Sequence, residues 1–135
     1  MREILFRGKQ TDNGEWIEGA YSPFHLNFGE REEKPHIIII SDDEDIDGLW
    51  CEVIPETVGQ YTGLTDKNEV KIFEGDIVRY GDTIHKVVFE HRNDTAYFGL
   101  VYSPFETLPF GHYQELKQIE VIGNIHGNPE LMKGE

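Results

Sequence analysis

Apolar and polar residues alternate loosely along much of this chain, with the period of two that is typical of half-buried β-strands. Residues 2–8 and 15–21 follow this pattern, and the polar segment between them, residues 11–14, ends in Asn-Gly. An Asn-Gly pair readily adopts the positive φ angles of a tight hairpin turn. The pattern therefore predicts that the chain opens with a β-hairpin.

Two further strands are expected before residue 55. Residues 36–40 hold four consecutive isoleucines, and so short a β-branched run favours a strand that is buried on both faces or paired at an interface. Residues 49–54 predict the next strand, after an acidic segment that ends the first. Residues 22–35 carry two prolines, a glycine and a run of charge without a clear period, so we expect a long surface loop there.

The second half of the chain predicts short, regular strands divided by turns. Pro55 closes the preceding region, and residues 56–61 fit a short helical turn stopped by Gly59. Beyond it we expect strands at 71–73, 77–80, 84–89, 95–102 and 120–125, turns at 65–68, 81–82 and 93–94, a loop at 103–113, and helical turns at 114–118 and from 128 onward. The three strands between residues 77 and 102 should form an antiparallel meander.

These elements predict an all-β protein, dominated by strands and with few short helical turns. We expect an N-terminal β lobe, residues 1–55, followed by a small SH3-like β-barrel with a C-terminal turn, residues 56–135. Some five short strands punctuated by turns are typical of that barrel. A chain of 135 residues is near the usual size of one domain, so the two lobes should form one compact folding unit.

The net charge restricts the partners that such a fold can take. It is −14, from 26 acidic and 12 basic residues, whereas binding a phosphate backbone requires clustered Lys and Arg, so direct nucleic-acid binding is disfavoured. Residues 30–56 alone hold ten acids and two bases. We interpret this acidic segment first as a solvated face that keeps the protein soluble. The alternative is a surface for a basic partner, or a mimic of nucleic acid.

Membrane association and disulfide bonding are both disfavoured by the sequence. No apolar run approaches the roughly 20 residues of a membrane-spanning helix, and the start of the chain lacks the apolar stretch of a signal peptide. We therefore expect a cytoplasmic protein with no membrane contact. Cys51 is the only cysteine, and we interpret it as a small buried apolar residue rather than a reactive thiol.

The sharpest local motif is Asp43-x-Asp45-x-Asp47-Gly48, which matches the first half of a calcium-binding loop. The second half is missing, because the twelfth position is Ile54 where a calcium loop needs a glutamate. The flanking segments also predict strands rather than helices. We interpret the motif as an acidic surface turn and keep its three aspartates as a weak calcium candidate that calorimetry can test.

The sequence contains no catalytic motif. Its six histidines show no pair at metal-ligand spacing, its serines lack a nucleophile elbow, and no phosphate-binding or dinucleotide-binding glycine pattern occurs. Acidic residues are too abundant for any two to be singled out as a general acid and base. We therefore expect a protein that is not an enzyme and that needs no cofactor or metal.

Several segments of the chain resemble the YopX family of phage and prophage proteins. The central ones are PETVGQYTGL at 55–64, DKN at 66–68 and IFEGDIV at 72–78. Both ends match as well, through REI, FRGK and GEW near the start and through EVIGNI and NPEL near the C-terminus. The chain departs from the family pattern at Glu69, where glycine usually stands, and this bears on the type of that turn.

The resemblance implies a small, β-rich protein that is encoded by a phage or prophage, in a family without an established activity. It does not extend to residues 22–50 or 90–113. The glycines of the pattern fall where turns need backbone freedom, so we interpret the pattern as mostly structural. The alternative is that Gln60, Tyr61 and Thr62 belong to a shared interaction surface, which alanine substitutions that preserve folding would reveal.

We expect a phage accessory protein that acts as a non-enzymatic protein–protein interaction module, with an unidentified host or phage protein as its partner. One alternative is an acidic decoy that binds a basic host protein at its nucleic-acid surface, and another is a nucleic-acid-binding barrel. Trp16, Trp50, Phe105 and Phe110, with the isoleucine run, offer material for a homo-oligomer interface, although filling the core is the favoured interpretation of these residues.

Overall fold

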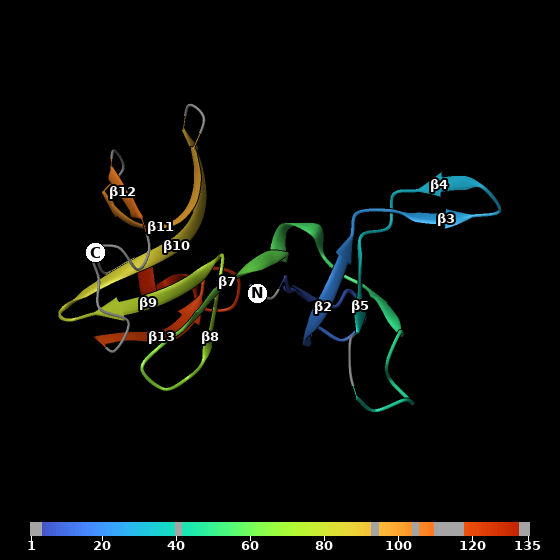
Figure 1. The fold of residues 1–135 in the computed structure, drawn as a ribbon, viewed down its shortest axis with the longest axis horizontal. Helices are drawn as coiled ribbons and strands as arrows, with labels where there is room; N and C mark the ends of the chain where they lie inside the picture. The colour runs from blue at the N-terminus through green and yellow to red at the C-terminus, as the bar shows by residue number, and fades with distance from the viewer. Residues whose placement is uncertain (1–3, 40–41, 93–94, 104–105, 110–117, 133–135) are drawn as a thin grey trace. The chain divides into compact units, whose positions relative to one another are not determined.

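The computed structural model shows a chain of β-strands that divides into two units (Figure 1). The structure describes residues 4–39, 42–92, 95–103, 106–109 and 118–132. The first unit is Met1–Tyr61 and the second is Thr62–Glu135. This division lies slightly beyond the one expected after residue 55. The all-β fold class is confirmed.

An antiparallel sheet forms the first unit. Its strands are β1 (Phe6–Lys9), β2 (Trp16–Ser22), β5 (His36–Ile39), β6 (Trp50–Glu52) and the beginning of β7 (Gly59–Thr65). They lie in the order β6-β5-β2-β1-β7, and their registered pairs are all antiparallel. The buried apolar residues of this unit are Leu5, Ile37, Val53 and Tyr61. The described core of the first unit is therefore small.

The predicted opening hairpin is confirmed as β1 and β2, whose register ends with Lys9 opposite Trp16. The loop between the two strands closes through a hydrogen bond from the Gln10 N–H to the Glu15 carbonyl (2.9 Å). Gly14 has a φ of +72°. The Asn-Gly pair thus supplies one left-handed residue in a longer loop, rather than the two of a tight two-residue turn.

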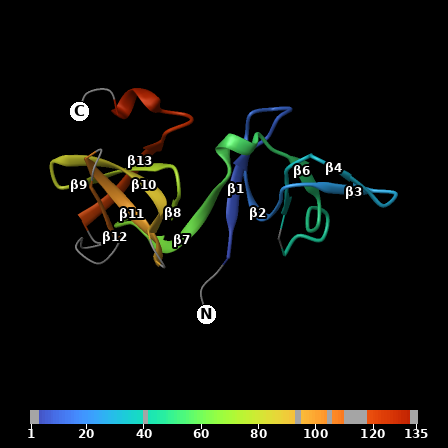
Figure 2. The ribbon, with the colours of Figure 1, turned by 90° about the horizontal axis from the view of Figure 1, so that it is seen from above.

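Residues 22–35 contain a second hairpin, so the prediction of a long surface loop was wrong. β3 (His25–Asn27) and β4 (Glu30–Glu32) pair with each other as a separate two-stranded sheet. Figures 1 and 2 show this hairpin projecting beyond the ends of β2 and β5. The pattern did not reveal it because three-residue strands are too short to show a period. Its turn also lacks the usual Asn-Gly or Asp-Gly signal.

The isoleucine strand is confirmed in its position as β5, which lies between β2 and β6. Its expected burial on both faces holds only in part. Ile37 is fully buried, whereas Ile38 and Ile39 are half-buried. Ile40 lies outside the described residues. Successive side chains of a strand point to opposite faces, and His36 (6% exposed) and Ile37 give each face one buried position at the start of β5.

The helical turn predicted at residues 56–61 is shorter than expected. A 3₁₀ turn, η1, spans Pro55–Thr57, and the strand β7 already begins at Gly59. The Thr57 hydroxyl accepts a hydrogen bond from the Lys9 N–H (3.0 Å), which ties this turn to β1. Gly59 therefore starts a strand rather than stopping a helix.

The second unit contains a five-stranded antiparallel sheet, together with the end of β7 and its neighbour β8. Its elements are β8 (Lys71–Phe73), β9 (Asp76–Tyr80), β10 (Thr83–Arg92), β11 (Thr95–Ser103), β12 (Glu106–Pro109), β13 (Ile119–Asn124) and the 3₁₀ turn η3 (Pro129–Met132). The order of the large sheet is β12-β11-β10-β9-β13. The predicted meander is confirmed, and Tyr80 opposite Thr83 confirms the two-residue loop at 81–82.

The predicted SH3-like barrel is not confirmed. Among the described residues the five strands form an open sheet with β12 and β13 at its edges, whereas a closed barrel requires its edge strands to pair. Residues 103–113, expected to be a loop, contain β12, which extends the meander by pairing with β11. The predicted turn at 93–94, residues 114–117 of the predicted helical turn, Phe105 and Phe110 lie outside the described residues.

A cluster of buried aliphatic side chains forms the core of the second unit. Its members are Ile72, Val78, Val87, Leu100 and Ile119, with Tyr80 and Val121 packed against them. At the turn between β8 and β9, Gly75 has a φ of +93° and the Asp76 carboxylate accepts a hydrogen bond from the Phe73 N–H (2.8 Å). The Phe-Glu-Gly-Asp part of the central pattern is therefore turn chemistry.

Candidate functional site

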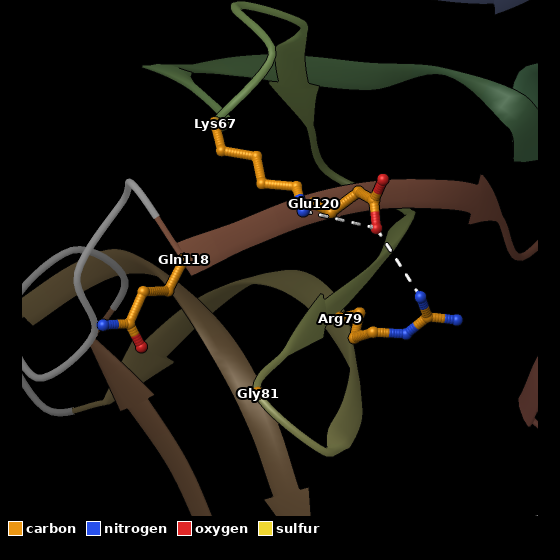
Figure 3. Close-up of a pocket in the computed structure, with 5 residues that line it drawn as sticks. All are labelled: Lys67, Arg79, Gly81, Gln118 and Glu120. Carbon is orange, nitrogen blue, oxygen red and sulfur yellow. Dashed lines mark ion pairs between the residues drawn. The ribbon is translucent and has the colours of Figure 1, made fainter.

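A pocket of about 290 Å³ opens in the second unit (Figure 3). The described residues that line it are Lys67, Arg79, Gly81, Gln118 and Glu120. They come from the β7–β8 turn, from β9 and the turn that follows it, and from β13 and the residue before it. The antiparallel pairing of β13 with β9 sets Glu120 opposite Arg79. This pairing brings residues that are distant in the sequence to one place.

Glu120 lies between the two cations of the pocket. Its Oε1 atom is 3.6 Å from Arg79 Nη1 and 4.0 Å from Lys67 Nζ, and Figure 3 shows the two side chains approaching it from different elements. All three side chains are one-third to one-half exposed, so each ion pair contributes only about 0–1 kcal/mol to folding. The pocket thus holds two positive charges and one negative charge within a strongly acidic chain.

Asp66 fixes the turn that carries Lys67. Its Oδ1 atom accepts hydrogen bonds from the N–H groups of Asn68 (2.8 Å) and Val70 (2.9 Å). Its Oδ2 atom accepts one from the N–H of Val121 on β13 (2.9 Å). The turn is thereby tied to β13, the strand that carries Glu120.

The pKa of the Asp66 carboxyl lies below its ordinary value. Burial alone would raise this pKa, since only 6% of the residue is exposed. The hydrogen bonds from the N–H groups of Val121, Val70 and Asn68 outweigh burial because they favour the ionised form, and the positive charge of Lys67 adds to them. Asp66 is therefore a carboxylate at neutral pH and holds the turn through charge-assisted hydrogen bonds.

Glu69 gives this turn its left-handed residue, with a φ of +65°. Its N–H donates a hydrogen bond to the Asp66 carbonyl (3.0 Å). Glycine, which usually stands here in the family pattern, adopts such an angle without strain, whereas a residue with a Cβ does so at a cost. The departure at Glu69 thus leaves the left-handed turn in place and adds local strain.

The pocket suits a small ligand that carries an anionic group beside a hydrogen-bond donor. Lys67 and Arg79 can bind carboxylate or phosphate oxygens, while the carboxylate of Glu120 can accept a hydrogen bond from the same ligand. None of the five described lining residues is a histidine, cysteine or serine. Lys67, Arg79, Gln118 and Glu120 thus offer charged and amide groups that can bind such a ligand.

The sequence alone did not single out the pocket residues as a set. Lys67 and Glu120 lie inside segments that resemble the family pattern, and that overlap is the signal that could have marked them. Arg79 and Gln118 carry no such signal. The pairing of β9 with β13 brings Glu120 to Arg79, and a hydrogen bond from the Lys67 N–H to the Ile119 carbonyl (2.9 Å) brings the β7–β8 turn to the same strand.

The three residues considered as a shared interaction surface differ in their accessibility. Tyr61 and Thr62 are 7% and 6% exposed, and Gln60 is half-buried. The Thr62 hydroxyl donates a hydrogen bond to the Ile72 carbonyl (2.8 Å). The geometry favours a structural role for Tyr61 and Thr62, and only Gln60 offers a partly accessible side chain for binding.

Asp43, Asp45 and Asp47 lie in an exposed turn. The Asp43 carboxylate accepts a hydrogen bond from the Asp45 N–H (3.0 Å), and the Asp43 carbonyl accepts one from the Asp47 N–H (3.0 Å). Within the described part of the chain, no group of three or more His, Cys, Asp or Glu residues is arranged to hold a metal ion. The calcium hypothesis gains no support from this geometry, and calorimetry with millimolar calcium would test it in solution.

The segment that contains this turn is exposed throughout, from Asp42 to Trp50, and we call it the acidic–apolar segment. Besides its acids it holds three large apolar residues. Ile46, Leu49 and Trp50 are 40%, 49% and 47% exposed. Trp50 begins β6, the outer strand of the first-unit sheet as described. The sequence indicates Trp50 as a possible interface residue, but it does not single out Ile46 or Leu49.

Two further expectations concern membrane spans and the single cysteine. Among the residues that the structure describes, no helix has the length and apolar character needed to cross a membrane. Cys51 is half-buried on β6, so its expected burial holds only in part.

Comparisons with known proteins identify a family and a similar solved structure. The family model described as YopX protein matches residues 5–133. No curated protein matches the chain. The crystal structure of protein EF1440 from Enterococcus faecalis is similar to it, with 23% sequence identity over 98% of this chain and 99% of that chain, and a TM-score of 0.48. At this identity and TM-score the likeness supports no statement about activity.

Proposed function

The chain belongs to the YopX family, and we propose that it is a phage or prophage accessory protein that acts as a non-enzymatic protein–protein interaction module. Its proposed place is the cytoplasm of the bacterial host. The acidic–apolar segment, residues 42–50, is the proposed contact surface. The partner is a host or phage protein that carries the complementary chemistry.

The observation that carries this proposal is the exposure of Ile46, Leu49 and Trp50 within five positions of one another. A single exposed apolar residue needs no explanation, because every folded protein has several. Three large ones in one short segment, set among acids, are typical of an interface. Tryptophan is also among the residues that most often dominate binding energy.

The charge of the segment indicates the chemistry of the partner. Residues 42–50 contain five acids and no base. A complementary partner therefore surrounds an apolar depression with Lys and Arg. Burial of the apolar side chains supplies affinity that salt does not screen, while the charges accelerate and orient the encounter.

Two matched substitutions test the proposal in an affinity capture from host lysate at low and high salt. Leu49→Ser removes an apolar side chain that is 49% exposed, and Val70→Ser removes one that is 47% exposed in the second unit. L49S should lower retention of the partner about tenfold, a difference of about 1.4 kcal/mol in binding. V70S should leave retention unchanged. Equal retention by the two variants at high salt would contradict the proposed surface.

The density of exposed acids favours a second candidate, an acidic decoy that binds a basic host protein at its nucleic-acid surface. Such binding should depend mainly on charge, so a basic DNA-handling protein would be recovered only at low salt. Replacing Asp42, Asp43 and Asp45 together by asparagine should then abolish recovery, while L49S should leave it nearly intact. If L49S instead abolishes recovery and the triple asparagine variant keeps it, the result favours the interaction module.

A nucleic-acid-binding barrel is the third candidate, and it receives the least support. The net charge of −14 opposes contact with phosphates. A gel shift of DNA or RNA at low salt is the outcome this candidate requires.

A further inference from the structure

The tip of the β3–β4 hairpin carries an exposed phenylalanine in an unusual backbone conformation. Asn27 lies opposite Glu30 in the register, so Phe28 and Gly29 form a two-residue loop. Their φ angles are +52° and +84°, and two consecutive left-handed residues are the mark of a type I′ turn. The position of Phe28 in that turn ordinarily holds Asn, Asp or Gly.

Phe28 is unfavourable for the folded chain in two respects. A left-handed residue with a Cβ is strained, because the Cβ approaches the following carbonyl oxygen. The side chain is also 101% exposed, so no burial of apolar surface offsets the strain. Strained residues of this kind concentrate at binding sites and switches, where the conformation serves a purpose other than folding.

The two basic residues that follow Phe28 along the chain, Arg31 and Lys34, make contacts with neighbouring side chains. The Arg31 guanidinium lies over the Phe24 ring, 4.4 Å from its centroid. Arg31 also pairs with Glu33 (2.8 Å), and Lys34 pairs with Glu32 (3.2 Å). Arg31 and Lys34 are thus both paired with acids of residues 30–34, and the third acid leaves this segment with a surplus negative charge.

We propose that Phe28 is an aromatic anchor that inserts into an apolar pocket with a basic rim on a partner protein. The proposal rests on the proposed function and adds a second contact to the acidic–apolar segment. An aromatic ring that enters a desolvated pocket is a common source of binding energy, and a preformed turn reduces the entropy lost on binding. Residues 28–34 hold three acids and two bases, so the complementary rim is basic.

The charges favour a protein partner over a lipid bilayer or a second copy of the chain. A segment that enters an anionic membrane surface is ordinarily rich in Lys and Arg, whereas this hairpin has a surplus of acid. Two copies of the chain, each with a net charge of −14, repel one another.

Phe28→Asn separates anchoring from folding. Asparagine tolerates the left-handed conformation, so F28N should raise the melting temperature by about 2 °C or more. In the lysate capture, the same variant should retain the partner about tenfold less than the wild type. A residue with only a structural role could not give both results.

Glu69→Asn is the matched control for the relief of strain. Glu69 is the other described non-glycine residue with a positive φ, and it lies in the second unit. E69N should therefore raise the melting temperature in the same way while it retains the partner at the level of the wild type. This pair of variants shows whether the loss in F28N comes from the ring rather than from the turn.

Each remaining outcome counts against the anchor. If F28N retains the partner as the wild type does, the anchor is contradicted while the interaction module stands. If the wild type retains no partner at low or high salt, the anchor and the interaction module are both contradicted. A melting temperature that falls in F28N contradicts the strain at Phe28. If vesicles of phosphatidylcholine and phosphatidylglycerol bind the wild type but not F28N, the ring inserts into a membrane and not into a protein.

If sedimentation shows a dimer of the wild type that is lost in F28N, the ring contacts a second copy of the chain and not a different protein.

Discussion

Two carboxylates near the pocket show how the surroundings of a residue decide its role. Asp66 is buried, and its two oxygens accept three backbone hydrogen bonds that join the β7–β8 turn to β13. Glu120 is one-third exposed and faces Lys67 and Arg79 at distances longer than a direct hydrogen bond. The first carboxylate therefore stabilises the fold, whereas the second adjusts the charge of the pocket.

Asp66→Asn should lower the free energy of unfolding by about 2 kcal/mol at pH 7, because hydrogen bonds to a charged acceptor are the stronger kind. An asparagine oxygen can still accept from Asn68 and Val70, but its amide group would then face the Val121 N–H, donor against donor. Urea unfolding followed by circular dichroism measures the change. A variant as stable as the wild type would show that the three hydrogen bonds add nothing to folding.

The pH dependence of Asp66 follows from its lowered pKa. The stabilisation is fully present above the ordinary carboxyl pKa of about 3.9 and is lost as the pH falls through the lower pKa of the folded state. The stability difference between the wild type and D66N should therefore be constant from pH 7 to 5 and shrink below pH 4. Unfolding curves across this range test it, and a difference that grows in acid would contradict the direction of the pKa shift.

Glu120→Gln should change stability by less than about 1 kcal/mol, since both ion pairs are exposed. It should also raise the affinity of the pocket for anions, because the carboxylate that pairs with Lys67 and Arg79 would be removed. Titration with inorganic phosphate, followed by the shift in melting temperature, measures this effect. Arg79→Gln is the opposing control, and it should weaken any phosphate response that E120Q strengthens.

At the scale of elements, the sequence predicted those strands whose turns carry a recognisable signal. The hairpin around Asn13-Gly14 and the loop at 81–82 were found in this way. The strands β3, β4 and β12 were missed because they are too short to show a period and no Asn-Gly or Asp-Gly pair marks the turns beside them. The pocket was missed for a different reason, since it depends on the pairing of β9 with β13 across a long stretch of sequence.

Gly19→Ala should destabilise the first unit by about 2 kcal/mol or more, because a Cβ at this position of β2 would collide with the Ile38 carbonyl oxygen on β5. Both tryptophans of the chain lie in the first unit, so their fluorescence during urea unfolding reports on it. Gly127→Ala is the control. An added Cβ there meets its nearest neighbour at 3.5 Å, an ordinary contact, and the fluorescence midpoint should stay unchanged.

At the scale of the whole molecule, the charge is the dominant property. The sum of −14 is carried mostly by exposed side chains, and those ion pairs that the described side chains form are largely exposed. Long-range repulsion among the acids therefore acts on both units, while local pairs do little to oppose it.

Raising sodium chloride from about 10 mM to 300 mM should increase the melting temperature, because the Debye length falls from about 30 Å to below 8 Å and screens the repulsion. Scanning calorimetry measures the shift. Sucrose of equal osmolality serves as the uncharged comparison. A melting temperature that falls with added salt would mean that attractive ion pairs outweigh repulsion.

The pairing of β9 with β13 also has a consequence for synthesis on the ribosome. β9 emerges about 40 residues before β13, and until then the side of β9 that will meet β13 has no neighbour from its own chain. Asp66 likewise lacks its Val121 donor during this interval. The nascent chain thus exposes an open strand edge that can pair with another nascent chain. A ribosome that stalls before residue 119 would prolong that state and favour aggregation.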